Sequence, residues 1–139
     1  MCQTSSLHNL LNSVPQGSVL GPLLFILNLT GIDPLITKHR VRYKLVYADN
    51  ILLYLICPPR DLDQMVSRLE SCVSELRQWL TSKFLVLNAD KTEFLLVGSA
   101  AHLRQQPQRS IRVGSTLITS KTFVRYLGVE LDQVLSMDK

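Results

Sequence analysis

An apolar stripe between residues 62 and 80 is the strongest restriction on how this chain can fold. Asp61 stands where it can cap the first turn of a helix, and Gln64, three residues later, completes a capping-box arrangement. The apolar residues of the stripe are spaced four, three, four, three and four apart, at Leu62, Val66, Leu69, Val73, Leu76 and Leu80. That spacing predicts an amphipathic helix with one face packed on a sheet.

Two short segments before this helix have the composition of strands. Residues 41–47 and 51–57 are rich in Val, Ile, Leu and Tyr, and they are separated by Ala48, Asp49 and Asn50. Because Asp and Asn tolerate turn geometry, we expect a hairpin with a carboxylate and an amide at its tip.

After Lys83 the apolar period shortens toward two. We predict a turn at residues 89–91 and a polar loop over 99–110. Extended segments are expected at residues 84–88, 92–98, 111–113 and 117–119, with a last strand over 124–131. Antiparallel strands with helices packed on one face define an α+β fold.

The segment from Val14 to Leu29, VPQGSVLGPLLFILNL, begins with proline and glycine and continues as an apolar run. We predict a loop to about Leu20 and a buried helix from Pro22 to about Ile32. The pair at residues 33–34 is expected to end that helix, because a residue that precedes proline is disfavoured in the helical region.

The composition limits the class of protein. With 139 residues, 46% of them hydrophobic, the chain is expected to be one folded domain. It has no apolar run long enough to span a membrane and no basic-then-apolar leader, so we expect an intracellular protein, nuclear or cytoplasmic, with no membrane partner. Its three scattered cysteines, Cys2, Cys57 and Cys72, fit reduced and partly buried thiols.

The charge is mildly basic and unevenly distributed. The net charge is +4, and the stretch from Ser99 to Val129 contains five basic residues and no acidic one. This stretch is compatible with a nucleic-acid partner, and a solvated basic face would give the same pattern.

Four segments occur in an order that carries more information than any of them alone. They are VPQGSVLGPLLF, YADN, LNADKTEFLL and YLGVELD, with the amphipathic helix between the second and third. The series resembles the reverse transcriptase of non-LTR (LINE-type) retrotransposons, motifs B to E, from about Val14 to Asp132. The resemblance implies part of a polymerase palm and an RNA-directed DNA polymerase ancestry. It also implies an RNA template and a DNA primer as partners, and Mg²⁺ or Mn²⁺ as the cofactor.

In that family, paired aspartates at the motif C hairpin and an aspartate of motif A hold two metal ions. Asp49 matches the first of the pair, which makes it the candidate catalytic residue and metal ligand; a plain turn-former at a hairpin tip is the alternative. Asn50 stands where the family has the second aspartate. A neutral amide cannot supply the negative charge that balances a divalent ion.

The resemblance assigns further residues. Lys91 matches the motif D lysine, a proton donor to the leaving pyrophosphate, although a lysine in a turn is equally well a solvated one. Pro15, Gln16 and Gly17 match the motif B loop near the template and nucleotide, where ordinary turn chemistry is the alternative. Trp79 and Phe84 are expected in the core.

The expected organisation is a non-matching segment over 1–13, a partial palm over 14–98, and a basic loop and hairpin over 99–139 with a motif E-like strand. Motif A, the fingers and the thumb are expected to lie outside this chain. Three functions stay open: a palm fragment unable to polymerise, a retroelement fragment without a selected role, or a nucleic-acid-binding remnant that uses Arg104, Arg109, Arg112, Lys121 and Arg125.

Overall fold

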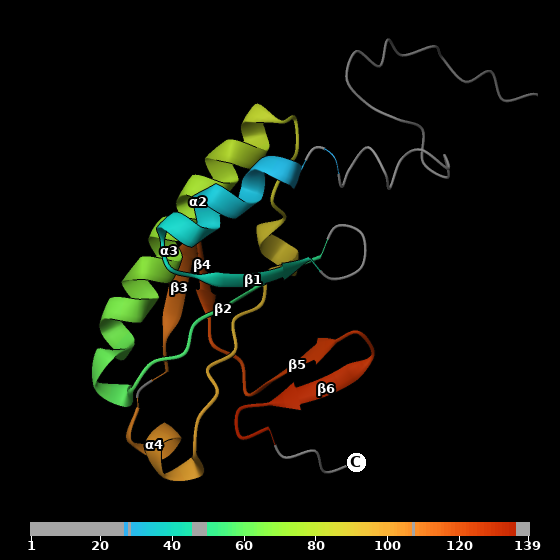
Figure 1. Ribbon diagram of the computed structural model, residues 1–139. Coiled ribbons are helices and arrows are strands. Elements are labelled where there is room, and N and C mark those ends of the chain that lie inside the picture. The colour runs from blue at the N-terminus through green and yellow to red at the C-terminus, as the bar shows by residue number, and fades with distance from the viewer. Residues whose placement is uncertain (1–26, 28, 46–49, 107, 136–139) are drawn as a thin grey trace, which may run out of the picture.

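The computed structural model describes residues 27, 29–45, 50–106 and 108–135. Figure 1 shows a long helix, α3, with a shorter helix, α2, along one side and small antiparallel hairpins around it. The α+β fold class is therefore confirmed, with its strands arranged as three two-stranded sheets in the described part of the chain. The predicted loop up to Leu20 and the predicted start of a helix at Pro22 lie outside the described residues.

Helix α3, Leu62–Ser82, confirms the predicted amphipathic helix and extends it by two residues. Its buried side chains are Cys72, Val73, Leu76 and Leu80. Asp61 is at the N-cap position, but its side chain makes no capping hydrogen bond, so the predicted capping box is wrong. Asp61 ends a 3₁₀ turn, η2 (Pro59–Asp61), with φ −99° and ψ 6°, whereas a capping side chain needs extended backbone.

The C-terminal end of α3 is closed by two backbone hydrogen bonds around a left-handed residue. Phe84 has φ 60°; its N–H donates to the carbonyl of Thr81 at 3.0 Å, and the N–H of Leu85 donates to the carbonyl of Leu80 at 2.9 Å. This is the bond pattern of a Schellman motif, and Leu80 and Leu85 pack in one apolar cluster as that motif favours. Phe84 itself is 73% exposed, so its predicted place in the core is wrong.

The predicted strands at 84–88 and 92–98 are absent from the described structure as regular elements. Side chains at 85 and 87 are half-buried while those at 84, 86 and 88 are exposed, so the alternation is real. However, this stretch pairs with no strand, and the later one contributes only an isolated parallel bridge between Leu95 and Lys121. Alternating burial needs only one apolar surface, whereas a strand also needs a partner for its backbone. The predicted turn is present as η3, Ala89–Lys91.

The helix before the first hairpin differs from the prediction. A 3₁₀ turn, η1 (Leu29–Gly31), leads into α2, Ile32–Lys38, so Asp33 and Pro34 start a helix instead of ending one. In the first turn of a helix the backbone N–H groups have no intrahelical acceptor, so Pro34 removes no helical hydrogen bond.

Three hairpins are formed by six strands. The pair β1, Arg42–Leu45, and β2, Ile51–Tyr54, confirms the first predicted hairpin, and β3, Ser110–Val113, with β4, Thr116–Thr119, confirms the second. Between β3 and β4, Gly114 has φ +63°, and a Cβ added there would lie 2.8 Å from the guanidinium carbon of Arg77. A side chain at 114 would therefore be both strained and obstructed.

The predicted single strand over 124–131 is instead a hairpin of β5, Phe123–Tyr126, and β6, Val129–Asp132. Leu127 and Gly128, at its turn, have φ 50° and 81°. Two consecutive residues with positive φ are the requirement of the tightest hairpin turns. Leu127 and Gly128 therefore reverse the chain in the middle of the predicted strand. A second missed element is α4, Ala100–Gln105, which lies in the predicted polar loop; Ser99 accepts a hydrogen bond from the N–H of His102 at 3.4 Å.

The core consists of two clusters on two sides of α3. One joins α3 to α2 and the first hairpin through Leu29, Ile32, Ile36, Val41, Cys72, Leu76 and Leu80. The other joins α3 to the second hairpin through Val73, Phe94, Ile111, Val113 and Ile118. Trp79 is half-buried against the first cluster, as predicted. None of the helices in the described residues combines the length and the apolar character that crossing a bilayer requires.

Candidate functional site

In the first hairpin, β1 and β2 are connected at one end, and the chain enters and leaves the hairpin at the other end. Leu45 pairs with Ile51 next to the turn, and Arg42 pairs with Tyr54 at the opposite end. Asn50 is exposed and immediately precedes β2. Asp49, the other residue predicted at the tip, lies outside the described residues. The part of the predicted metal site that the structure describes is thus a solvent-facing amide.

The strand that carries Asn50 is fixed by the core. Ile51 packs against the first cluster, and Leu53 packs against both clusters. Because a strand alternates its faces, anchoring at 51 and 53 sets the direction in which the chain leaves the tip. The position of Asn50 is therefore determined by packing.

Lys91 lies in η3 and is exposed. The side-chain oxygen of Asn88 accepts hydrogen bonds from the N–H groups of Asp90 at 3.1 Å and Lys91 at 3.3 Å. Ala89 packs against the second core cluster. This cap and this contact hold the backbone of the turn, while the ammonium group of Lys91 remains in solvent.

The structure brings the hairpin and the η3 turn onto a common core. Leu87, just before the turn, packs against both clusters, as Leu53 of β2 does. In Figure 1 the ochre turn at residues 89–91 lies beside the β1–β2 hairpin. Pro15, Gln16 and Gly17, the third predicted element, lie outside the described residues.

Two of the five basic residues predicted to bind nucleic acid are engaged in ion pairs. Arg109 is half-buried and pairs with Asp63 of α3. Lys121 pairs with Glu93 at 2.5 Å, next to the bridge that joins residues 95 and 121. Both cations connect separate segments of the fold, so their charges are partly neutralised.

The other three basic residues are exposed and separately placed. Arg104 lies on α4, Arg112 on β3 and Arg125 on β5. None of these side chains forms an ion pair or hydrogen bond with another residue in the described ranges. They are the members of the predicted set that remain open to an anion.

Polar groups that the sequence did not single out tie the helices together. Tyr43 on β1 hydrogen-bonds to Asp33 of α2; burial first, and then this acid, raise the pKa of the tyrosine. Glu75 on α3 lies 3.0 Å from the ammonium of Lys38 and 2.6 Å from Nε2 of His39. These hydrogen bonds, that of His39 first, lower the pKa of Glu75. No spacing in the sequence indicated either contact, because both join distant segments.

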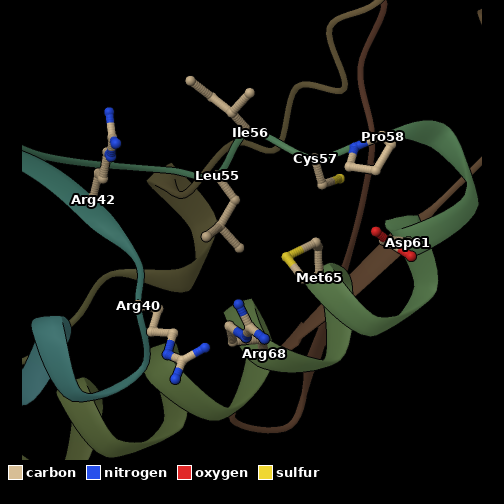
Figure 2. Close-up of a pocket in the computed structure, with 9 residues that line it drawn as sticks. All are labelled: Arg40, Arg42, Leu55, Ile56, Cys57, Pro58, Asp61, Met65 and Arg68. Carbon is tan, nitrogen blue, oxygen red and sulfur yellow. The ribbon is translucent and has the colours of Figure 1, made fainter.

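Two arginines absent from the sequence-based predictions, Arg40 and Arg68, line a pocket near the start of α3 (Figure 2). By contrast, no group of three or more His, Cys, Asp or Glu side chains within the described residues is arranged to hold a metal ion. At the hairpin tip the structure describes only the neutral amide of Asn50, and the predicted ligand Asp49 lies outside the described residues.

Antiparallel hairpins and helices make the described residues a mixed α+β fold, which is consistent with part of a polymerase palm. A sequence model of the family described as reverse transcriptase (RNA-dependent DNA polymerase) matches residues 2–131. The chain belongs to the reverse transcriptase family. No curated protein and no solved structure matches it.

Proposed function

We propose that this chain derives from the reverse transcriptase of a non-LTR retrotransposon and that the 139-residue polypeptide does not polymerise nucleotides by itself. The observation that carries the second part is Asn50, an exposed amide directly before β2. In the motif that YADN resembles, this position holds the second of two aspartates.

The chemistry supports a loss of activity. Nucleotide addition uses two divalent ions that stabilise the attacking and leaving oxygens, and hard ions such as Mg²⁺ require carboxylate ligands. In this proposal Asp49 keeps its ancestral character as a Mg²⁺ or Mn²⁺ ligand. Asn50 offers one neutral oxygen and no charge, so any ion is held more weakly than at an aspartate pair.

The remaining assignments follow from the same ancestry. Pro15, Gln16 and Gly17 would lie near the template and nucleotide, and Lys91 would donate a proton to pyrophosphate. The exposed ammonium of Lys91, on a turn held by Asn88, is compatible with that role. The partners would be an RNA template and a DNA primer, inside the cell.

Primer extension on an RNA template tests the proposal. The 139-residue chain is assayed in parallel with an active reverse transcriptase at the same concentration, which serves as the positive control. We expect no incorporation with Mg²⁺ or Mn²⁺ beyond that of a chain carrying Asp49→Ala. Extension that disappears in the Asp49→Ala protein would show a competent site and overturn the proposed inactivity.

A second candidate, a non-catalytic nucleic-acid-binding remnant, is favoured by the three exposed arginines without partners. Binding through phosphates releases counterions, so affinity for a primer–template should fall steeply as salt rises. Replacing Arg104, Arg112 and Arg125 by Gln should flatten that slope. If the salt dependence of the affinity is unchanged in the triple variant, these arginines do not bind nucleic acid and the basic face is only a solvated surface.

A further inference from the structure

A pocket of about 270 Å³ lies at the end of the first hairpin that is remote from Asn50 (Figure 2). Its walls come from the start of β1 and the residues before it, from the residues after β2, and from η2 and the first turns of α3. Since Arg42 pairs with Tyr54 and Leu45 with Ile51, the pocket is removed from the turn by roughly 10 Å of strand. It is therefore separate from the predicted metal site.

The pocket is lined by three arginines and one acid. Figure 2 shows Arg40 and Arg68 extending into the same part of the pocket, beside Met65, while Asp61 lies at its other end. Arg42 points away from the other two arginines. The guanidinium groups of Arg40 and Arg68 form no ion pair or hydrogen bond with any residue in the described part of the chain. Two guanidinium groups therefore share one pocket, and neither is ion-paired with Asp61 at its other end.

Both arginines are held on fixed backbone. Arg40 has φ 56°, an uncommon conformation for a side chain of its size, and its N–H donates to the carbonyl of Thr37 at 2.8 Å. Its near neighbours Ile36 and Val41 are buried in the first core cluster. Arg68 lies on α3, next to Leu69, which packs on the same cluster. The core therefore fixes the positions of the two arginines. At position 40 the chain has an arginine in a backbone conformation that glycine would adopt with less strain.

We propose that this pocket binds a phosphate group between Arg40 and Arg68. A guanidinium group presents paired N–H donors that match two oxygens of a phosphate, and two such groups can hold one phosphate from two sides. The carboxylate of Asp61 disfavours an anion at its own end, so the phosphate is directed to the arginine end.

The lining and the volume of the pocket limit the size of the group attached to the phosphate. Leu55 and Met65 line the pocket, and Ile56 at its rim is 81% exposed. The volume is below the roughly 300–1,000 Å³ usual for small-molecule sites, which suits one phosphate with an adjoining sugar. The source is a phosphodiester of a nucleic-acid strand or a free nucleotide. The proposal does not depend on polymerase activity.

Binding to the full 139-residue chain tests it, with three probes measured separately: inorganic phosphate, adenosine monophosphate and a short single-stranded oligonucleotide. We expect Arg68→Gln and Arg40→Gln each to weaken binding about tenfold. Arg60→Gln is the matched control, because Arg60 is exposed on η2, outside the pocket, and its loss changes the net charge equally. Arg68→Lys keeps the charge but loses the paired donors, so its affinity should lie between those of the wild type and the glutamine variant.

Cys57 supplies a second readout, since it lines the same pocket. Occupancy should slow modification of Cys57, mapped by mass spectrometry, in the wild type but not in Arg68→Gln. Protection by the oligonucleotide at lower concentration than by the two small probes identifies a strand phosphodiester; the reverse order identifies a free nucleotide or phosphate. Equal weakening by Arg60→Gln and Arg68→Gln, or no protection of Cys57 by any probe, overturns the proposal. A chain that fails to extend a primer would not contradict phosphate binding in this pocket.

Discussion

Nε2 of His39, the residue that closes α2, lies 2.6 Å from Oε2 of Glu75 on α3. The contact joins residues 36 apart in the sequence and is partly buried. Lys38 reaches the other oxygen of the same carboxylate at 3.0 Å. One acid on the polar face of α3 therefore fastens the C-terminal end of α2.

This cluster predicts a pH dependence of stability. The pKa of Glu75 is lower in the folded protein than its ordinary value of 4.5. Its contribution is therefore present above about pH 4.5 and is lost as the pH falls through the folded value. Thermal unfolding from pH 7 down to pH 3 should show a smaller loss of stability in Glu75→Gln than in the wild type. Asp90→Asn, a change at an exposed acid on η3, should leave the profile unaltered; identical profiles for all three proteins would contradict the prediction.

The apolar face of α3 predicts a contrast in stability. Leu76 is 1% exposed between α2 and the first hairpin, so Leu76→Ala should lower the free energy of unfolding by about 2–5 kcal/mol. Gln78 lies two residues later on the exposed face, so Gln78→Ala should lower the free energy of unfolding by less than about 0.5 kcal/mol. Chemical denaturation measures both, and equal losses would be incompatible with the amphipathic arrangement.

The left-handed residue after α3 predicts a stabilising change. Phe84 has φ 60° and is 73% exposed, so Phe84→Gly relieves strain and loses little packing. Glycine loses more conformational entropy on folding, which offsets part of this relief. We therefore expect the free energy of unfolding to rise by about 0.5 kcal/mol. Val86→Gly is the matched control: Val86 is 89% exposed, and positive φ does not occur there, so this variant should be destabilised. Destabilisation by both changes would argue against a strained Phe84.

The two described cysteines should differ in reactivity. Burial, reinforced by Glu75, raises the pKa of Cys72 to about 11, and the side chain is fully buried. At pH 8 only about one thiol in a thousand would then be ionised, and it is also inaccessible. Cys57 is half-buried, so native-state alkylation followed by peptide mapping should modify Cys57 first. Cys72 should react only on unfolding, and modification of both at one rate would contradict its burial.

The parts of this fold that were predictable are those encoded by local periodicity. The stripe of α3 and the first two hairpins were found because each pattern is complete within a few residues. The segments 84–88 and 92–98 were predicted as strands from their alternation, but whether such a segment pairs is decided by backbone elsewhere in the fold. The turn at Leu127 and Gly128 was missed because leucine rarely takes a positive φ, and α4 because its six residues have no apolar stripe.

Of the candidate site, the family was predictable, because the order of motifs led to it. Asn50 and Lys91 are both exposed in the described structure, and their roles stay predictions. The pairing of Arg109 with Asp63, 46 residues away, could not be inferred from a run of like charges. The same applies to Arg40 and Arg68, which become neighbours in a pocket only through the packing of α3 on the first hairpin.

The most direct test is primer extension by the chain carrying Asn50→Asp, on an RNA template, in Mg²⁺ and separately in Mn²⁺. The change restores one charge at the tip, but two adjacent carboxylates on one turn cannot position two ions. Asp33, the nearest acid upstream, hydrogen-bonds to Tyr43 in the first turn of α2. Positioning supplies most of the catalysis of phosphoryl transfer. We predict no product above that of the Asp49→Ala protein; extension above this control would show that the chain contains a competent polymerase site.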